Sequence, residues 1–535
     1  MIFYYSHAWQ IATPLLLVVF YTVLKKFTGG GGRKLPPGPR PVPLLGNVHQ
    51  LPLLYQQRAF AQWGRVYGDL IYARLFQKPA LVLNSVQVAQ DLMDKRSSKY
   101  SDRPNFILLT ELIGWHPVSA FMPYGKRRRK HRQWIQSAYV DQNSLLSYRP
   151  VQRRESYALV AALLESPDQF LAHTRRFAAA VVMETVFGQP IPSGANEEHL
   201  QAALQATMAT NDAATLTASL VDFFPFMRHI PTWMPGAGFK HNALLVRTYV
   251  SAIMDKPYDV VKAAITSGTA KPSFMTKCMD KPIEGDPKEH EEYIKGAAGV
   301  LYAAGIDTTM IALSTLILAM ALYPECLKKA QEEIGRVVGS HRLPEFEDRD
   351  SLPYLECIIK EVYRWNPPVP LGITHSLSED DVYQGYHMPK GAIVVSNMWG
   401  MANKSDVYAE PDAFRPERFA GMEPDIADLK DPRKYVFGFG RRICPGRYFA
   451  DTSIWLAAAS MIATLDVYKA RNSQGQEIIP PAAFRPGFIS IPEEFPCEIR
   501  PRSEKVSKMI FEMLNATHDS APAASSVSSY EDTMA

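Results

Sequence analysis

The order of apolar and polar positions predicts helices over most of the chain, separated by a few short strands. Long stretches repeat apolar residues at helical spacing, mostly in the middle of the sequence. Two short aliphatic runs between turn residues, 81–83 and 392–396, predict strands instead. The pattern therefore indicates a mainly α fold with small β-sheets, and it shows no internal repeat.

The longest helical pattern predicts one helix over 287–322. Asp286 can cap its first turn, Glu289 can complete a capping box, and Pro324 follows directly after its end. Such a helix is about 50 Å long, enough to cross a whole domain. Its second half is apolar enough to suggest a membrane span, but a central Asp costs about 3 kcal/mol in a bilayer. A buried core helix with one polar notch fits better.

The N-terminus reads as a membrane anchor. Residues 9–24 are nearly all apolar, and Lys25 and Lys26 follow directly. By the positive-inside rule the rest of the chain lies on the cytosolic side. The alternative, a cleaved signal peptide, lacks a small-residue cleavage site after the apolar run. We therefore expect a single transmembrane helix within residues 1–28.

The rest of the 535-residue chain divides into three predicted parts. Residues 29–47 are rich in Gly and Pro and predict a tether. Residues 48–502 contain no separating linker, which favours one large catalytic unit. Residues 503–535 are rich in Ser, Ala and acidic side chains, which predicts a largely disordered tail in which 505–514 can form a short helix.

Charge and cysteine content exclude some classes of protein. With 47% hydrophobic and 21% charged residues the composition is that of a globular protein, and a net charge of +4 does not indicate a nucleic-acid binder. The cysteines are odd in number and have no CxxC spacing, which favours free thiols in a reducing compartment. They are Cys278, Cys326, Cys357, Cys444 and Cys497.

The most informative segment surrounds Cys444. Phe437, Gly440 and Gly446 stand at fixed offsets around this cysteine. The glycines allow a tight loop in which backbone N–H groups point at the sulfur and lower its pKa. A thiolate held in this way is a metal ligand, and one lone cysteine suggests haem rather than zinc. The alternative is a buried structural cysteine in a glycine-containing turn.

The order Phe-x-x-Gly-x-Arg-x-Cys-x-Gly resembles the haem-ligand loop of the cytochrome P-450 haem-thiolate monooxygenases. The resemblance extends over residues 36–502, and from 323 to 419 it is most similar to fungal members of secondary metabolism. It implies the cytochrome P-450 fold, iron protoporphyrin IX as the cofactor and Cys444 as the axial ligand of its iron. Phe437, Gly440 and Gly446 would shape the cofactor loop.

A polar notch interrupts the long helix at Asp307 and Thr308. Ala304 and Gly305 leave the helix surface open there, and the Thr308 hydroxyl can bond a carbonyl one turn earlier. An acid beside a hydroxyl can deliver protons, and the segment resembles the oxygen-activating part of the family's central helix. The alternative is a helix contact in which the aspartate is satisfied by a partner.

A charged network is the third element of the resemblance. Glu361 and Arg364 lie three residues apart, so they share one helix face and can pair. They match the family's Glu-x-x-Arg signature, and Arg418 supplies the second arginine. The implied role is structural.

The resemblance also implies partners for the carboxylates of the haem. These are Arg442 in the cysteine loop, His375, and Arg132. One departure stands out: the family often has Trp four residues before the last of these, and here Arg128 occupies that position. The replacement puts the local packing and the retention of haem in question.

The basic run 126–132 reads as a docking surface rather than a nuclear signal, because a membrane anchor precedes it and the net charge is small. The resemblance places it on the side where an acidic NADPH–cytochrome reductase docks, with cytochrome b5 as a second candidate donor. A merely solvated basic face is the alternative.

The predicted function is the insertion of one oxygen atom from O2 into a lipophilic molecule, at the endoplasmic reticulum membrane. The resemblance implies that segments 106–121, 297–304, 369–373 and 488–489 face the substrate. They are almost all apolar, which favours a terpenoid, polyketide or sterol skeleton. Two alternatives stay open: a haem-thiolate isomerase or dehydratase that needs no external electrons, and a non-catalytic haem-binding relative.

Overall fold

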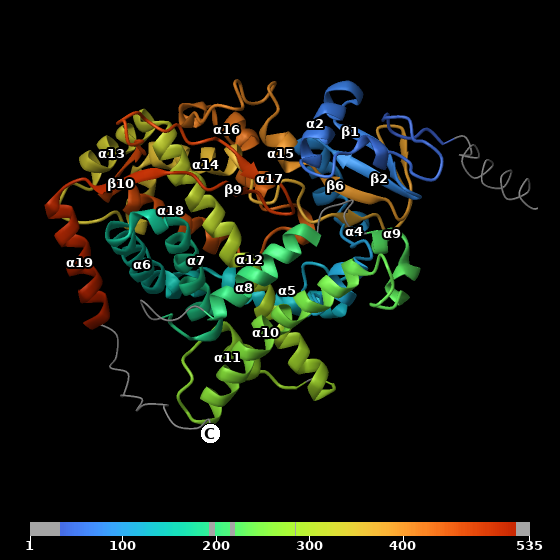
Figure 1. Ribbon diagram of the computed structural model, residues 1–535, viewed down its shortest axis with the longest axis horizontal. Coiled ribbons are helices and arrows are strands. Elements are labelled where there is room, and N and C mark those ends of the chain that lie inside the picture. The colour runs from blue at the N-terminus through green and yellow to red at the C-terminus, as the bar shows by residue number, and fades with distance from the viewer. Residues whose placement is uncertain (1–32, 192–197, 214–219, 284, 520–535) are drawn as a thin grey trace, which may run out of the picture.

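Helices make up most of the molecule, and the largest sheet lies at one end of it (Figure 1). The computed structural model describes residues 33–191, 198–213, 220–283 and 285–519. The fold is mainly α with small β-sheets, as the sequence pattern predicts. The predicted membrane anchor lies in residues 1–28, outside the described residues.

The helical body consists of long helices joined by short ones. The long helices are α2 Gln56–Tyr67, α5 Lys126–Tyr139, α6 Gln142–Glu165, α7 Phe170–Phe187, α8 Glu198–Ala213, α10 Gly238–Thr266, α12 Pro287–Leu322, α13 Pro324–Val337, α14 Pro353–Trp365, α18 Arg447–Thr464 and α19 Glu504–Asp519. The short helices are α3 Val86–Ala89, α4 Ser97–Tyr100, α9 Leu220–Phe223, α11 Phe274–Met279, α15 Met398–Ala402, α16 Pro424–Lys430 and α17 Arg433–Val436. Single helical turns of other pitch are η1 Val48–Gln50, η2 Gln90–Lys95, η3 Ile107–Leu112, η4 Pro167–Gln169, η5 Pro225–His229, η6 Phe346–Ser351, η7 Pro416–Phe419 and η8 Gly440–Arg442.

The strands form one four-stranded sheet and three two-stranded ones. Their bounds are β1 Leu70–Leu75, β2 Lys78–Leu83, β3 His375–Ser376, β4 Asp381–Tyr383, β5 Tyr386–Met388, β6 Ile393–Ser396, β7 Leu465–Lys469, β8 Phe484–Arg485, β9 Ile491–Pro492 and β10 Cys497–Pro501. The larger sheet has the order β1-β2-β6-β3, in which only β2 and β6 are parallel. Both predicted strands lie in this sheet, as parts of β2 and β6.

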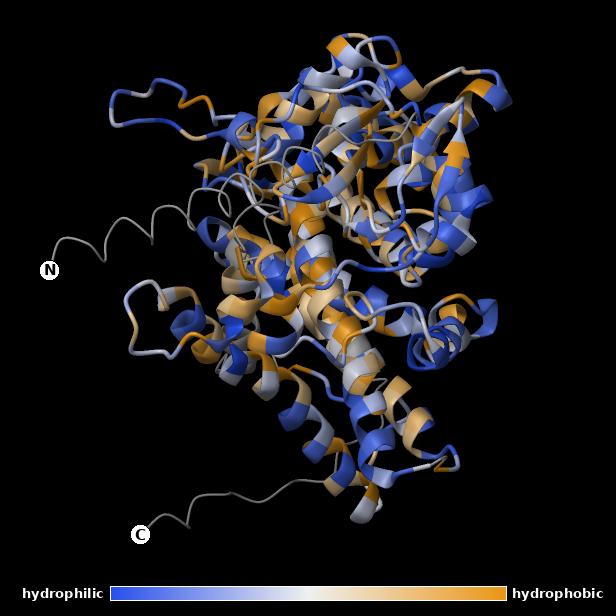
Figure 2. Ribbon diagram, turned by 90° about the vertical axis from the view of Figure 1, so that its right-hand side faces the viewer, coloured by the Kyte–Doolittle hydropathy of each residue, from blue (hydrophilic) through white to orange (hydrophobic). Residues whose placement is uncertain are grey.

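Helix α12 crosses the core, as its sequence pattern predicts (Figure 2). Asp286 caps it by accepting a hydrogen bond from the N–H of Lys288 at 3.1 Å. The expected capping box does not form, since Glu289 accepts a hydrogen bond from the hydroxyl of Tyr293. The helix is long and apolar enough to span a membrane, but 83% of its most apolar window is buried inside the protein. It is therefore a core helix.

Close packing of α12 on α7 depends on Gly305. A Cβ atom at this position would lie 2.8 Å from Cγ2 of Val182 on α7, closer than real Cβ contacts come. The glycine therefore lets the two helices approach at the level of the polar notch.

Residues 33–47, the described part of the predicted tether, are bonded to the rest of the protein. The N–H of Tyr72 on β1 donates to the carbonyl of Pro37 at 3.0 Å, and Arg33 pairs with Asp380 at 2.9 Å. Asn47 accepts from the N–H of Arg74 at 2.8 Å. These bonds fasten the segment to the sheet, so the described part of the tether belongs to the folded body.

The short helix predicted within residues 505–514 of the C-terminal tail is present. Residues 504–519 form α19, which is longer than the predicted helix and packs against α6. Ile510 is fully buried, and Met509, Met513 and Leu514 pack against the same core cluster. This apolar stripe at helical spacing stabilises the helix through tertiary contact. Residues 520–535 lie outside the described part of the chain.

Candidate active site

The segment around Cys444 folds into a tight loop between α17 and α18. The Cys444 N–H donates to the carbonyl of Phe437 at 2.7 Å and closes the loop. Gly440 has a φ of +52°, and a Cβ atom there would lie 2.0 Å from the carbonyl oxygen of Met93. No other residue fits this position, so the predicted need for glycine is confirmed at Gly440.

The same argument is wrong for Gly446. Its φ is −87°, which any residue adopts, and a Cβ atom there would meet nothing within 4 Å. The second glycine that does need its conformational freedom is Gly438, with a φ of +76°. What Gly446 provides is its backbone N–H, which hydrogen-bonds the sulfur of Cys444.

Cys444 faces a cavity of about 310 Å³ between its own loop and helix α12. Burial raises the pKa of the Cys444 thiol, while the Gly446 N–H, Arg132 and Arg447 oppose that shift. The loop alone therefore does not produce the lowered pKa expected from the sequence. A coordinated metal ion deprotonates a thiol outright, so a metal would supply the missing stabilisation of the thiolate.

The wall of the cavity opposite Cys444 is the notch in α12. Ala304, Gly305 and Thr308 line it, and Ala304 is exposed although most of the helix around it is buried. The Thr308 hydroxyl donates to the carbonyl of Ala304 at 2.8 Å, the back-bond predicted from the sequence. Thr309 lines the cavity as well, so the notch presents small side chains and two threonines.

Asp307 does not share this wall with Thr308. Consecutive helix residues point about 100° apart, and the Asp307 carboxylate lies toward α7, where it pairs with Arg175 at 2.8 Å. It also hydrogen-bonds Thr207 on α8. Burial raises the pKa of the Asp307 carboxyl, and the Arg175 charge opposes the rise. The side-by-side pair expected from the sequence is thus an inward hydroxyl and a carboxylate held by a cation behind it.

Four arginines surround one edge of the cavity: Arg103, Arg128, Arg132 and Arg442. Among the residues that the structure describes, no carboxylate lies within 4.0 Å of any of their guanidinium groups. Burial lowers the pKa of Arg442 to about 9 and that of Arg132 to about 10. Buried positive charge is costly unless it is paired, so this edge favours an anionic occupant.

Sequence reasoning placed two of these arginines and His375 at the cofactor, and the structure brings all three to the cavity. His375 is buried, and its Nδ1 donates to the carbonyl of Tyr100 at 2.6 Å. Burial holds the His375 pKa well below its usual range. Arg103 was missed, because a single arginine after an aspartate carries no motif.

The predicted network of Glu361, Arg364 and Arg418 forms. Arg364 grips the Glu361 carboxylate with two N–H groups at 2.7 and 2.8 Å, and the Arg418 Nε lies 3.1 Å from it. All three side chains are almost completely buried. Removing one partner of a buried ion pair costs about 3–5 kcal/mol, so the network stabilises this part of the fold.

A second network, missed from the sequence, joins α14, α17 and α18. Arg349 pairs with Asp451 at 2.7 Å and with Glu356 at 3.0 Å, and Arg433 pairs with Glu356 as well. The hydroxyl of Tyr363 donates to Asp451 at 3.3 Å. Most of these residues are far apart in sequence, so no local motif predicts that they pair. Their ion pairs fix the helices on either side of the cysteine loop.

The rest of the cavity is apolar. Val300, Leu301, Val369 and Ile373 line it, as predicted for the substrate side. A smaller space of about 80 Å³ continues outward past Ile373 and is lined by segments that were also predicted. Its predicted members are Phe106, Leu109, Phe121 and Phe488. Ile489, in contrast, packs into a core cluster with Met310 and Ile311.

The donor set around the cavity fits haem. One sulfur stands on one wall, four guanidiniums stand along an edge, and small side chains on α12 leave room opposite the sulfur. Haem accepts a thiolate ligand and carries two carboxylates, which match the sulfur and the unpaired positive charge.

Comparison with known proteins agrees with this chemistry. The family model of cytochrome P450 matches residues 36–495. The chain is 46% identical over 486 residues to cytochrome P450 monooxygenase 176 of Postia placenta, a match that covers 90% of this chain and 93% of that protein. It is 45% identical to monooxygenase 136 of the same fungus, over 94% of each chain. It is 39% identical to cytochrome P450 monooxygenase ple1 of Rhodocybe pseudopiperita, over 89% of this chain and 91% of that protein.

The two loop glycines make a matched pair for a test. We expect Gly440→Ala to reduce the haem content of the purified protein about tenfold or more, because its Cβ collides with the Met93 carbonyl and its φ is left-handed. Gly446→Ala should retain the wild-type haem content. The measurement is haem per polypeptide by absorbance. Equal haem content in the two variants would contradict this account of the loop.

Proposed function

The chain belongs to the cytochrome P450 family and is by that membership a haem monooxygenase; from this premise we propose that it oxidises a lipophilic small molecule of fungal secondary metabolism, with Cys444 as the ligand of the haem iron. The observation that carries the proposal is the cavity itself, which is lined by Cys444, by Thr308 and by mostly apolar side chains. Electrons come from NADPH through a separate reductase at the endoplasmic reticulum membrane.

The residues of the chain bind and orient the reactants. Haem, when bound, supplies the iron at which O2 is activated, so that one oxygen atom enters the substrate and the other leaves as water. Cys444 would hold the iron, and Arg132 would bind the carboxylates at an edge that Arg442 and His375 also line; Phe437 lines the cavity on the side of the cysteine loop. Val300, Val369 and Ile373 exclude water and hold an apolar substrate against the reacting centre.

Protons reach the oxygen side through α12. Thr308 is the group in contact with the cavity, and its hydroxyl both donates and accepts. Asp307 holds the proton supply behind it. Because Arg175 pairs with its carboxylate, Asp307 delivers protons only when it exchanges that partner for water. Thr308 is therefore the catalytic hydroxyl, and Arg175 positions the acid.

The reductase docks on the basic side of the cysteine loop. Lys126 and Arg129 of α5 and Arg441 of the loop are exposed, and Arg441 immediately precedes the cofactor-binding Arg442. Lys434, also expected there, pairs with Asp428 at 2.6 Å and contributes less. An exposed cationic surface beside the cysteine mainly speeds and orients the encounter with an acidic partner.

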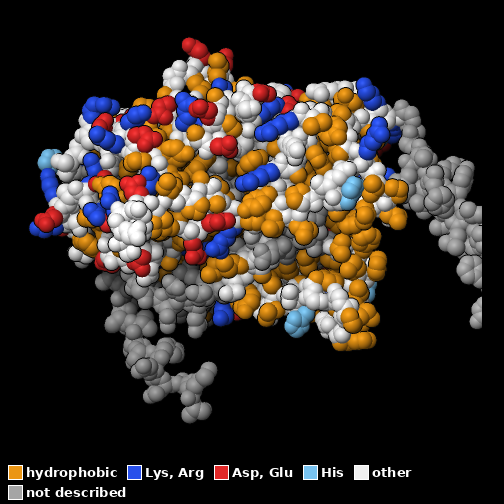
Figure 3. All heavy atoms as spheres, turned by 45° about the horizontal axis from the view of Figure 1, so that its top comes forward, with side chains coloured by type: hydrophobic (Ala, Val, Ile, Leu, Met, Phe, Trp, Pro, Cys, Tyr) orange, Lys and Arg blue, Asp and Glu red, His pale blue; other side chains and the backbone are white. Residues whose placement is uncertain are grey.

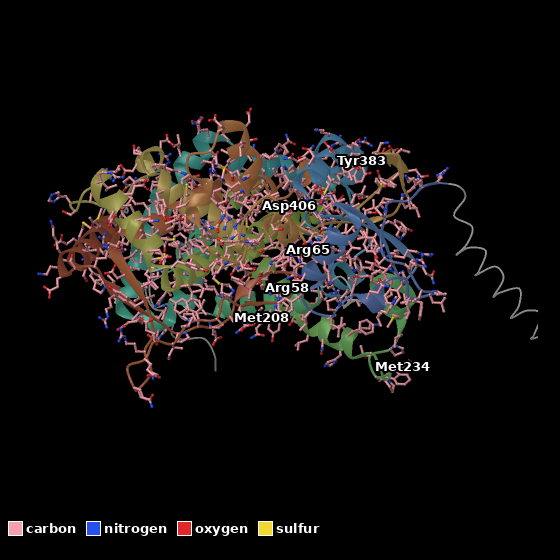
Figure 4. The ribbon with its side chains drawn as sticks, turned by 90° about the horizontal axis from the view of Figure 1, so that it is seen from above. Arg58, Arg65, Met208, Met234, Tyr383 and Asp406 are labelled. Carbon is pink, nitrogen blue, oxygen red and sulfur yellow. The ribbon has the colours of Figure 1, made fainter. Side chains whose placement is uncertain are left out.

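The membrane side is the end that carries the sheet and the connection from α9 to α10. Apolar side chains gather there (Figure 3), and Met234 stands at the edge of the molecule (Figure 4). Trp233 is 79% exposed and Phe226 is 68% exposed on that connection, and Leu53 is 77% exposed beside it. Leu53 also lines the outer space that leads to the cavity. A lipophilic substrate, of terpenoid, polyketide or sterol type, therefore enters from the bilayer.

The two alternatives are less well supported. The relatives carry the name monooxygenase, which does not favour an isomerase or dehydratase. The cavity retains sulfur, cations and the Thr308 hydroxyl, which does not favour a non-catalytic relative. Product formation without NADPH would restore the first alternative.

Replacing the cysteine tests the cofactor assignment. We expect Cys444→Ser to lose the thiolate-type Soret absorption of the reduced carbon-monoxide complex, because a hydroxyl does not replace the thiolate. Cys497→Ser in β10 is the matched control and should keep the wild-type spectrum. An unchanged spectrum in the first variant would rule out Cys444 as the ligand.

Removing the hydroxyl tests the proton path. Thr308→Ala should keep haem but lower the product formed per NADPH about tenfold or more, with a matching rise in hydrogen peroxide. Thr308→Ser, which keeps a hydroxyl, should retain coupling. The substrate is found first by feeding lipophilic skeletons to cells that express the chain with a reductase, with mass spectrometry of the products. Wild-type coupling in the alanine variant would contradict the role of Thr308.

Truncation tests the membrane anchor. Deleting residues 1–28 should move a large part of the protein from the membrane pellet to the soluble fraction, because the predicted span is lost, and leave the haem spectrum unchanged. Fractionation followed by immunoblotting measures the change. A truncated chain that stays wholly in the pellet after a high-salt wash would contradict the anchor.

A further inference from the structure

The four arginines at the cavity differ in how many of their N–H donors the protein itself uses. A guanidinium has five N–H donors. Arg442 spends three of them on the carbonyls of Ser101, Ser119 and Met122, at 2.7, 3.1 and 3.0 Å. These carbonyls belong to the segment 101–122, part of which lines the cavity. Arg442 therefore serves mainly to hold this segment in place.

Arg103 is a second clamp of the same kind. It donates to the carbonyls of Ala120, Ile373 and Thr374 at 2.8, 2.6 and 2.7 Å. His375 is limited in another way. Its Nδ1–H already bonds Tyr100, so the Nε2 of the neutral ring accepts hydrogen bonds and does not donate. These two residues therefore have little left to offer a carboxylate.

Arg128 and Arg132 keep most of their donors. They lie four residues apart on α5 and so share the face that lines the cavity. The backbone takes one bond from each: Arg132 donates to the carbonyl of Ile443, and Arg128 to that of Arg441. Arg128 also bonds the hydroxyl of Tyr124, and its guanidinium carbon lies 5.3 Å from the centre of that ring. It is 6% exposed, so its position is set before any ligand binds.

The positive charge of Arg128 also repels the other three arginines. Burial is the main cause that lowers the pKa of Arg103, Arg132 and Arg442, and the charge of Arg128 lowers it further in all three. Asp102 offsets part of this repulsion at Arg103 and Arg442, but among the described residues no carboxylate lies within 4.0 Å of any of the four guanidinium groups. A buried cation kept in this position without a protein counter-ion is typical of a binding site for an anion.

We propose that Arg128 binds a carboxylate of the haem and, with Arg132, forms the principal anchor of that group in this protein. The proposal rests on the proposed haem site. The sequence suggested that an arginine at this position weakens the retention of haem, and the structure indicates the opposite. The arginine replaces a neutral indole donor with a charged guanidinium that has more N–H groups, and it therefore strengthens the retention of haem.

The experiment compares purified haem-loaded wild type with Arg128→Gln, Arg128→Lys and the control Arg129→Gln. Arg129 is the next residue on the same helix, carries the same charge and is exposed away from the cavity. Haem loss is followed as transfer to excess apomyoglobin. Loss should be about tenfold faster or more in Arg128→Gln, the scale of one charge-assisted hydrogen bond, and within about twofold of wild type in Arg129→Gln.

The reduction potential of the iron gives a readout of the charge at position 128, and the lysine variant separates the effect of charge from that of packing. Removing a positive charge beside the cofactor favours the ferric state, so the midpoint potential should fall in Arg128→Gln and stay near that of wild type in Arg128→Lys and Arg129→Gln. Haem loss in the lysine variant should lie closer to wild type than in the glutamine variant.

Two results would overturn the proposal. One is wild-type haem retention and potential in Arg128→Gln; the other is a lysine variant that loses haem as fast as the glutamine variant, since the role would then be one of shape rather than charge. Failure of the haem site itself is separate, because the wild type would then lack the thiolate-type carbon-monoxide spectrum.

Discussion

The carboxylate of Glu361 is the interaction on which the arrangement around the cavity depends. It is fully buried, and it is gripped by Arg364 from its own helix and by Arg418 from the segment that follows β6. It also accepts a hydrogen bond from the N–H of Arg415 at 2.8 Å. Arg364 and Arg418 also donate hydrogen bonds to backbone carbonyls within residues 402–413. One buried charge thereby organises the long loop that leads into the cysteine segment.

The arginines at Glu361 have a structural role, whereas the arginines at the cavity edge have the features of a binding site. At Glu361 two cations meet one carboxylate and several carbonyls, so the charge is satisfied within the protein. At the cavity four cations gather, and among the described residues none of their guanidinium groups has a carboxylate within 4.0 Å, so the protein holds them for something else. Burial is costly for both sets of charges, and the difference in their partners is what identifies the second set as a ligand site.

The two polar residues of the notch in α12 also differ in whether the protein itself provides their partner. Gly305 admits α7, which brings Arg175 to the carboxylate of Asp307 and turns that acid away from the cavity. Thr308 is left as the hydroxyl that faces the reacting centre. The two residues are neighbours in sequence, but helix geometry and the packing of α7 give them different surroundings and therefore different roles.

The sequence by itself determined the mainly α fold, the limits of the central helix, the Glu361 network and the residues that meet at Cys444, because each depends on local spacing or on side chains with few chemical alternatives. Only the tertiary structure decided the features that depend on distant parts of the chain. Gly440 and not Gly446 needs to be glycine, because the Met93 carbonyl lies against it. Residues 504–519 are helical because α6 covers their apolar stripe, and Asp307 turns to Arg175. It also decided the meaning of Arg128. In the sequence this residue is a departure from a motif, and in the folded protein it is a buried cation with unused donors, because the donors of its neighbours are already bound to carbonyls.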